Sequence, residues 1–394
     1  MRSALLLGTF RVANQTNPNP VEFDFPLYQQ FVLDHLVWFL AGIALLSFGV
    51  NHFFSNKALL IALRKRLFAE QSARSSHQEP TPAFGGVSIF IVVMITLLLT
   101  IGAGFDNAIG FTLASCFILF LTGLKDDLIG TSARTKFFVQ ILAAFLFVVN
   151  PDFALGHLSG FLGIGLIDPN WTYLIGMVFI VSLVNAFNLI DGIDGLSGMT
   201  AIVGFTVFGV YFYINDYYVY TIFCVTLIGA LTSFLTFNFA KPGGKMFMGD
   251  TGALVMGFLL AVFSLRILEL QPLEAFVGFY PKNAPLFILS VLIIPVLDTA
   301  RVIVIRLSNG QRPWHADRSH MHHVLLDLGY SHKQATARLI GLQVFAIIGY
   351  TIVDSLGNIA LHGYVVALYL SVTAGFMVLS KRVSQSGEVA AKFG

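Results

Sequence analysis

Two adjacent carboxylates, Asp126 and Asp127, lie at the end of a strongly apolar run of the sequence. Charged side chains at the edge of a membrane span are costly unless a cation or a proton-transfer step uses them. Three further acidic or histidine clusters lie at the ends of later apolar runs: Asn188-Leu-Ile-Asp191-Gly-Ile-Asp194-Gly195, Phe247-Met-Gly-Asp250-Thr-Gly252 and Asp317-Arg-Ser-His320-Met-His322-His323. A chain that gathers its few charges at such boundaries is expected to be an enzyme working at a membrane surface.

The spacing of Asn188, Asp191 and Asp194 suggests an oxygen-rich site. Residues three apart fall along one side of a helix, and the intervening glycines let the backbone approach a ligand closely. Carboxylate and amide oxygens at this spacing suit Mg²⁺. The alternative is that Asp191 and Asp194 cap the start of the next helix, although capping needs only one Asp.

Asp250 and Lys136 each have two interpretations. Asp250 could be a simple helix cap, but the basic, Gly-rich stretch Lys241-Pro-Gly-Gly-Lys245 before it suits a diphosphate held between metal and lysine. Lys136 opens an apolar run ten residues after Asp126. It could anchor a helix end at the cytoplasmic face, or hold the phosphate of a lipid.

A last group of polar residues surrounds the ninth apolar run. Asp298 and Arg301 could form a structural ion pair within a helix bundle. The following loop holds Arg312, His315, Asp317, Arg318, His320, His322 and His323. This loop could be a surface patch or a transition-metal site, but it lacks the His-Glu-x-x-His spacing of zinc hydrolases. Arg and His donors aimed at phosphate oxygens fit it better.

Composition assigns the chain to the integral membrane proteins. Hydrophobic residues make up 56% of the sequence, charged residues 11%, and the mean hydropathy is +0.79; soluble domains carry about 25% charged residues. Apolar runs of about 17–25 residues are read as spans. They predict an all-α, polytopic protein with eleven transmembrane helices: 31–50, 83–102, 109–124, 136–151, 172–190, 199–214, 218–238, 251–268, 285–306, 338–354 and 360–380.

Lysine and arginine predict the orientation. With this topology, 19 of the 23 fall on one side and four on the other; because positive residues favour the cytoplasm, the N-terminus is expected outside and the C-terminus inside. The predicted organisation is an outer tail (1–30), one catalytic membrane domain (31–380) and a cytoplasmic tail (381–394). The tail 1–30 does not read as a cleavable signal. Cys116 and Cys224 lie inside spans and predict no disulfide framework.

These clusters, in this order, resemble the polyprenyl-phosphate N-acetylhexosamine-1-phosphate transferases. The likeness runs from about Pro80 to Lys333. It rests on Pro82-Ala-Phe-Gly85-Gly86, Asp126-Asp127, Asn185-Ala-Phe-Asn188-Leu-Ile-Asp191-Gly-Ile-Asp194-Gly195, Phe247-Met-Gly-Asp250 and His320-Met-His322-His323. Each motif alone is weak, but five in order on one membrane face are specific. The loop Lys241–Lys245, which follows Asn238, is slightly longer than in some relatives.

The resemblance implies a reaction in which undecaprenyl phosphate attacks the β-phosphorus of a UDP-sugar and releases UMP. It implies Mg²⁺ as cofactor, with Mn²⁺ as an alternative, held by Asn188 and Asp250. Asp126 would be the base or orienter, with Asp127 supporting the metal region. Asp191 and Asp194 would face the nucleotide, and His320, His322 and His323 the diphosphate and sugar. Further expected substrate contacts are Gly85, Gly86, Lys136, Asn188, Asn238, Lys245, Arg301 and Arg318.

The form Asp317-Arg-Ser-His320-Met-His322-His323 looks like that of UDP-N-acetylglucosamine users, whereas pentapeptide transferases show three consecutive histidines. The same reaction with another UDP-N-acetylhexosamine is the alternative. The resemblance also implies a bacterial cytoplasmic (inner) membrane protein that initiates a lipid-linked cell-surface glycan (O-antigen, common antigen or a teichoic acid linkage unit). It implies no nucleic-acid partner and leaves a homodimer open.

Two other classes of protein share some of these features. A secondary transporter would also be polytopic and Gly-rich, but it would place ionisable residues near mid-membrane in broken helices and often show repeats. Here most spans are free of charge at mid-depth. An intramembrane metalloprotease using the histidines would leave Asp126, Asp127 and Asp191 without a role.

Overall fold

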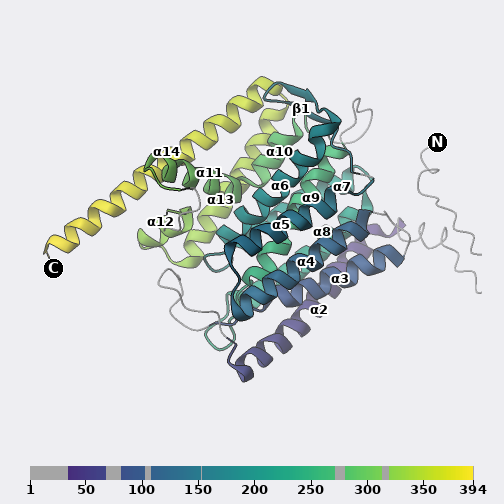
Figure 1. The fold of residues 1–394 in the computed structure, drawn as a ribbon, viewed down its shortest axis with the longest axis horizontal. Helices are drawn as coiled ribbons and strands as arrows, with labels where there is room; N and C mark the ends of the chain where they lie inside the picture. The colour runs from purple at the N-terminus through teal and green to yellow at the C-terminus, as the bar shows by residue number, and fades with distance from the viewer. Residues whose placement is uncertain are drawn as a thin grey trace, which may run out of the picture.

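The computed structural model describes residues 34–67, 81–102, 108–151, 153–270, 280–312 and 319–393. In these ranges the protein is a bundle of helices with one small β-hairpin (Figure 1). The helices of its first half are α2 (Leu36–Lys65), α3 (Gly85–Gly102), α4 (Ala108–Ile129), α5 (Ala133–Val148), α6 (Pro169–Ile190) and α7 (Leu196–Ile214). Those of the second half are α8 (Tyr218–Asn238), α9 (Gly249–Glu269), α10 (Ala284–Val291), α11 (Ile293–Ser308), α12 (Met321–Asp327), α13 (His332–Asp354) and α14 (Asn358–Phe393).

Helix α9 forms the centre of the bundle. Its apolar window is wholly buried, and it packs against α3, α4, α6 and α7. A helix that is hydrophobic all round is expected in such a position. The more exposed helices α2 and α14 lie at the periphery (Figure 1). Because α4 and α6 end, and α9 begins, at one end of the bundle, the polar residues at these termini are brought together.

Every predicted apolar run falls on a helix or, for the ninth, on a pair of helices. Within the described residues, eight helices are long and apolar enough to cross a membrane, and the bent pair α10–α11 raises the number to nine. Helix α5 has 16 residues, slightly fewer than a full span usually needs. The described residues therefore support a polytopic protein with eight or nine candidate spans, against the eleven predicted.

The ninth span is broken where the sequence reads as one apolar run. Helices α10 and α11 meet at an angle of 86°. Pro295 has no backbone N–H, so it cannot bond to the carbonyl four residues earlier. That carbonyl, of Val291, accepts from Gln343 Nε2 on α13 at 2.8 Å instead. A buried glutamine thus satisfies the backbone that the break exposes.

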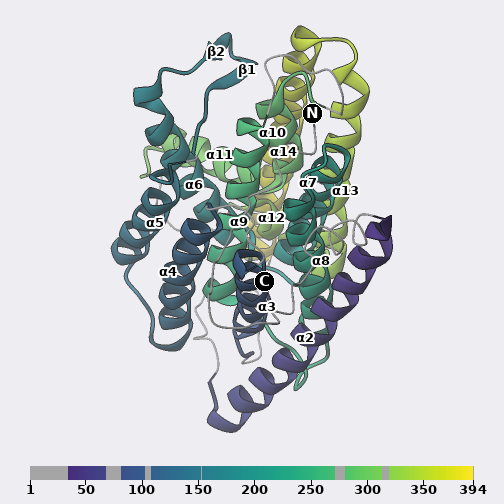
Figure 2. The ribbon, with the colours of Figure 1, turned by 90° about the vertical axis from the view of Figure 1, so that its right-hand side faces the viewer.

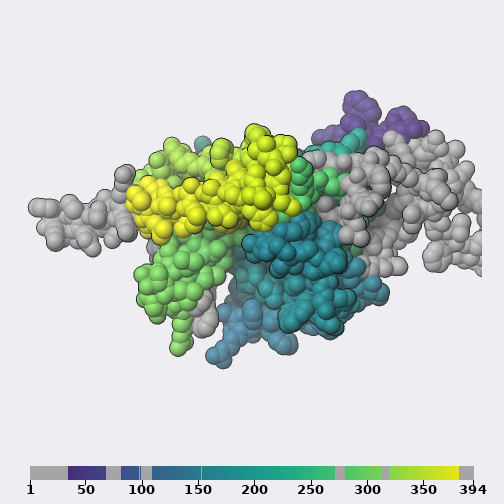
Figure 3. Space-filling model, turned by 90° about the horizontal axis from the view of Figure 1, so that it is seen from above, coloured from purple at the N-terminus to yellow at the C-terminus, as the bar shows by residue number. Residues whose placement is uncertain are grey.

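The β-hairpin marks the opposite end of the bundle. Strands β1 (His157–Phe161) and β2 (Ile164–Leu166) pair antiparallel, directly before α6 (Figure 2). The Leu162 N–H donates to His362 Nε2 of α14 at 3.2 Å. Side chains of this segment accordingly lie beside α14 on the face seen in Figure 3. The sequence did not predict this hairpin.

The structure describes the predicted C-terminal tail but not the predicted N-terminal tail. The outer tail 1–30 lies outside the described residues. At the other end, α14 continues through Phe393, so the residues predicted as a C-terminal tail extend the last helix.

Candidate active site

Asp127, at the end of α4, caps the N-terminus of α9. Its Oδ1 accepts from the Asp250 N–H at 2.9 Å, and its Oδ2 accepts from the Thr251 N–H at 3.0 Å and the Thr251 hydroxyl at 2.5 Å. These bonds satisfy N–H groups that a helix start leaves unpaired. Asp250 itself is therefore not the cap of α9, and the capping interpretation of this residue is wrong.

Gly249 permits this close approach. Its φ is +70°, and a Cβ there would lie 2.6 Å from Asp127 Oδ2 and 2.7 Å from the Ala83 carbonyl oxygen. Only glycine meets both conditions without strain. Gly249, the glycine before Asp250, therefore allows the end of α4 to pack closely against the start of α9.

Lys136, in the first turn of α5, bridges two carboxylates. Its Nζ lies 2.6 Å from Asp126 Oδ2 and 2.5 Å from Asp250 Oδ2. All three side chains are about one-fifth exposed. The interpretation of Lys136 as a helix-end anchor therefore does not describe its contacts, because the side chain points into an acidic site.

Gly85 and Gly86 hold the loop before α9 through their backbone. Their N–H groups donate to the carbonyls of Phe247 and Met248, both at 2.9 Å, and the Phe247 N–H donates to the Pro82 carbonyl at 2.8 Å. A Cβ on Gly86 would lie 2.1 Å from the Gly252 nitrogen. The contact with substrate expected for these glycines stays a prediction, and their visible contacts are with this loop.

Asp191 and Asp194, in the segment between α6 and α7, have different hydrogen-bond partners. The Ser197 hydroxyl donates to Asp191. Burial raises the pKa of Asp191 to about 7; the Ser197 bond opposes this shift, and the negative charges of Asp250, Asp127 and Asp194 add to it. Neither Asp caps α7, whose N-cap is Gly195 with no side-chain hydrogen bond.

Asp194 connects three elements. Its Oδ2 lies 2.6 Å from Lys245 Nζ and 3.5 Å from His332 Nδ1, and its carbonyl accepts from the Thr336 hydroxyl at 2.7 Å. His332 and Thr336 belong to the first turns of α13. The predicted pair Asp194 and Lys245 is thus brought together, and α13 supports it.

Asn238 fixes the same segment from α8. Its Oδ1 accepts from the Gly195 N–H at 2.6 Å, and its Nδ2 donates to the Met246 carbonyl at 3.0 Å. Both groups of the amide are therefore used by backbone. Asn238 nevertheless lines the cavity described below.

The histidine cluster lies against the segment that follows Asp191. The rings of His320 and His322 stack at 5.8 Å, and those of His322 and His323 lie 4.3 Å apart. A Cβ on Gly192 would lie 2.3 Å from His322 Nε2, so this glycine makes room for the ring. Burial lowers the pKa of His322 to about 3, and the ring is neutral at physiological pH.

Arg301 and Arg318 were both predicted to contact substrate, and the structure describes only Arg301. Arg301 is fully buried and contacts Asp298 at 3.2 Å and the Ser319 carbonyl. The ion pair expected of Asp298 and Arg301 is thereby confirmed, while binding of substrate by Arg301 stays a prediction. Arg318 lies outside the described residues.

A cavity of about 210 Å³ opens among these elements. Its lining comprises Ala83, Asp127, Asn188, Asp191, Ile193, Asn238, Phe247, Gly249 and Asp250. In the described part of the chain, no three His, Cys, Asp or Glu side chains are already arranged around a metal ion. The donors still fit Mg²⁺, because three carboxylates and the Asn188 amide line one space, in addition to Asn238, whose amide is bonded to backbone. Their mutual repulsion, seen at Asp191, is what a cation would relieve.

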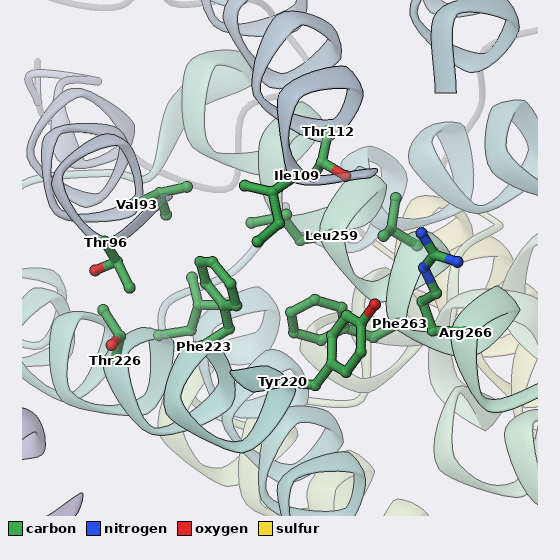
Figure 4. Close-up of a pocket in the computed structure, with 12 residues that line it drawn as sticks. Val93, Thr96, Ile109, Thr112, Tyr220, Phe223, Thr226, Leu259, Phe263 and Arg266 are labelled. Carbon is green, nitrogen blue, oxygen red and sulfur yellow. The ribbon is translucent and has the colours of Figure 1, made fainter. Parts of the chain in front are cut away.

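A second cavity, of about 20 Å³, has a different character (Figure 4). It lies among α3, α4, α8 and α9, and its lining is apolar apart from threonines, Tyr220 and Arg266. None of its lining residues is a carboxylate. The acidic cavity is therefore the candidate active site.

An acidic, lysine-bridged cavity at one end of a membrane bundle is suited to phosphate chemistry at a membrane surface. Comparison with known proteins leads to the same kind of chemistry. The family model for glycosyl transferase family 4 matches residues 108–268. The chain belongs to the polyprenyl-phosphate N-acetylglucosamine-1-phosphate transferases of this family, and it is a multi-pass membrane enzyme that transfers a sugar 1-phosphate to a polyprenyl phosphate.

Three relatives illustrate the similarity. The decaprenyl-phosphate N-acetylglucosaminephosphotransferase of Mycobacterium tuberculosis is 30% identical over 315 residues, covering 75% of this chain and 78% of the relative. The probable undecaprenyl-phosphate N-acetylglucosaminyl 1-phosphate transferase of Bacillus subtilis is 28% identical, with 70% and 74% covered. The undecaprenyl-phosphate alpha-N-acetylglucosaminyl 1-phosphate transferase of Salmonella typhimurium is 26% identical, with 74% and 78% covered.

Several residues of the site were missed by the sequence analysis. Thr251 and Ser197 hold Asp127 and Asp191, and His332 and Thr336 hold Asp194. Another is Gln140, one helical turn from Lys136, whose Oε1 accepts from Asn185 Nδ2 at 2.5 Å. A polar residue inside an apolar run was the available signal for Gln140.

Proposed function

We propose that this enzyme transfers N-acetylglucosamine 1-phosphate from UDP-N-acetylglucosamine to undecaprenyl phosphate and releases UMP. The observation that carries the proposal is the acidic cavity lined by Asn188, Asp191 and Asp250, with Lys136 bound to its rim. Asn188, Asp191 and Asp250 also belong to the motifs that carry the resemblance to the family. The acceptor is embedded in lipid and the donor is soluble, so their reaction requires a site at the end of the bundle.

In the proposed reaction, an oxygen of the lipid phosphate forms a bond to the β-phosphorus. The bond between that phosphorus and the oxygen bridging to the α-phosphate breaks, and UMP leaves. Phosphoryl transfer depends mainly on in-line positioning and on neutralising charge on phosphate oxygens. The lipid phosphate has a second pKa of about 6 and is mostly dianionic at neutral pH, so a base contributes little.

The roles of the residues follow from their places. Lys136 is positioned to hold the lipid phosphate, with Asp126 orienting it through the ion pair of 2.6 Å. Lys245, which is paired with Asp194, would contact the donor diphosphate. The cluster from Arg318 to His323 would supply further polar contacts for the diphosphate and sugar.

Asn188 and Asp250 would hold Mg²⁺, with Mn²⁺ as a substitute. The ion, when bound, supplies charge neutralisation on the diphosphate. Asp127 would position Asp250 through its two bonds to the start of α9. Asp191, buried beside these carboxylates, would add negative charge to the site.

The membrane orientation is part of the proposal. The distribution of 19 against four positive residues supports a cytoplasmic active site and an outer N-terminus. The bacterial relatives support the bacterial inner membrane as its location. All site elements described above lie at one end of the bundle, as this orientation requires. The product would start a lipid-linked surface glycan.

Purified enzyme should be assayed for UMP release with a panel of UDP-sugars and with undecaprenyl or decaprenyl phosphate. Radiolabel should pass from UDP-N-acetylglucosamine into butanol-extractable lipid. Exclusive use of another UDP-sugar would refute the donor, and a strong preference for decaprenyl phosphate would refute the acceptor. A transporter would release no UMP.

A further inference from the structure

The buried carboxylate of Asp298, on α11, has contacts that the proposed reaction does not use. Its Oδ2 lies 3.0 Å from His320 Nδ1. Its Oδ1 accepts from the Met321 N–H at 2.8 Å and from Arg301 Nη2 at 3.2 Å. Asp298 is 1% exposed and His320 6%. These bonds are therefore shielded from water, which would otherwise replace them.

Asp298 and Arg301 together hold the backbone from which the histidine cluster starts. Arg301 Nη2 also donates to the Ser319 carbonyl. The two residues thus hold both sides of His320, at Ser319 and at Met321. His320 immediately precedes the short helix α12, and its ring contacts the Asp298 carboxylate and stacks on His322.

The contact also determines which nitrogen of His320 carries hydrogen. An ionised carboxylate only accepts hydrogen bonds, so Nδ1 must be the donor. Nε2 then remains as the ring nitrogen available to a ligand. Through His322, which stacks on His320 and packs against Gly192, the ring lies next to the segment that carries Asp191.

We propose that Asp298, with Arg301, is a positioning residue that fixes the ring orientation and Nδ1–H tautomer of His320, leaving Nε2 to accept a hydrogen bond from a hydroxyl or N–H group of the donor substrate. This inference rests on the proposed function of the same site. The alternative is an ion pair that only stabilises the bundle. In that case the loss of Asp298 would not act through His320.

A double-mutant cycle separates the two roles, because residues acting through one another give non-additive effects. The variants are Asp298→Asn, His320→Ala and their combination. The asparagine keeps the shape but can donate to Nδ1, which favours the other tautomer. The matched control is Asp327→Asn, at the exposed end of the same short helix α12.

Activity is measured on whichever UDP-sugar the wild type turns over, so failure of the donor assignment is seen separately. We expect Asp298→Asn and His320→Ala each to lower kcat by about 10²-fold or more. The combined variant should be no slower than His320→Ala within about threefold, and Asp327→Asn should be unchanged. If Asp298→Asn lowers kcat by the same factor with and without His320, the proposal is overturned.

A second measurement does not depend on a variant of Asp298 folding. ¹⁵N NMR of histidine-labelled wild type, with His320 assigned by the His320→Ala spectrum, reports which ring nitrogen is protonated. The proposal requires a hydrogen on Nδ1. A neutral His320 ring with its hydrogen on Nε2 would refute it.

Discussion

Replacement of Lys136 is the sharpest test of the site, because this one side chain contacts both Asp126 and Asp250. We expect Lys136→Ala to raise the KM for undecaprenyl phosphate much more than the KM for the UDP-sugar. A hydrogen bond to a charged group contributes about 1.5–3 kcal/mol. Loss of one such bond to the lipid phosphate corresponds to a KM increase of roughly 10- to 100-fold.

The structure limits this magnitude in two ways. The Lys136 side chain is 25% exposed, so solvent screens part of its interaction. Its present bonds of 2.6 and 2.5 Å to carboxylates must also be exchanged for the bond to phosphate. The expected factor is therefore nearer the lower end of the range.

Initial-rate measurements with each substrate varied at saturating levels of the other give both KM values. Lys136→Arg keeps the charge and should recover part of the affinity. Lys125→Ala removes an exposed lysine eleven residues earlier and should change neither KM. Equal increases in both KM values would show that Lys136 only balances the charge of Asp126 and Asp250, and would refute its role in lipid binding.

Three further predictions test the cavity. Asp250→Ala should abolish turnover while the protein still melts cooperatively, since Asp127 can still bond to the start of α9; near-normal activity with Mg²⁺ would remove Asp250 from the metal site. Gly192→Ala should lower kcat/KM for the donor at least tenfold by displacing His322, whose Nε2 would lie 2.3 Å from the new Cβ, whereas Gly341→Ala, which meets nothing within 4 Å, is the silent control. The pKa of Asp191 is raised to about 7 in the folded protein. Between about pH 4 and pH 7 the folded protein therefore keeps a proton on this carboxyl group that the unfolded chain has released. The contribution of Asp191 to stability consequently falls as pH rises through this range. Asp191 attracts a cation only when it is ionised. The Mn²⁺ affinity, measured by EPR without substrates, should therefore rise with pH up to about 7 and then level off. Asp191→Asn should flatten this pH profile, and an unchanged profile in the variant would contradict the role of Asp191 in the charge of the site.

The sequence predicted the helical architecture well because apolar length is a local property. Each of the eleven apolar runs lies on a helix or on the bent pair. The break between α10 and α11 was missed because one apolar run continues across it, although Pro295 was a visible signal. The hairpin at His157–Leu166 was missed because strands of five and three residues are too short for a clear alternating pattern.

The site was predicted as a set of residues but not as a set of contacts. Asp127 and Thr251 are 124 positions apart, and Lys136 and Asp250 are 114. No spacing rule along one chain connects such residues. The capping interpretation of Asp250 failed because the cap of α9 comes from Asp127 on a different helix. That of Asp191 and Asp194 failed because the N-cap of α7 is Gly195, without a side-chain hydrogen bond.

The two lysines of the site explain how so much negative charge is tolerated there. Lys136 is paired with Asp126 and Asp250, and Lys245 is paired with Asp194. Partly buried carboxylates are costly without such partners. A divalent cation entering with its anionic substrate would take over the carboxylates and leave both lysines to the phosphates.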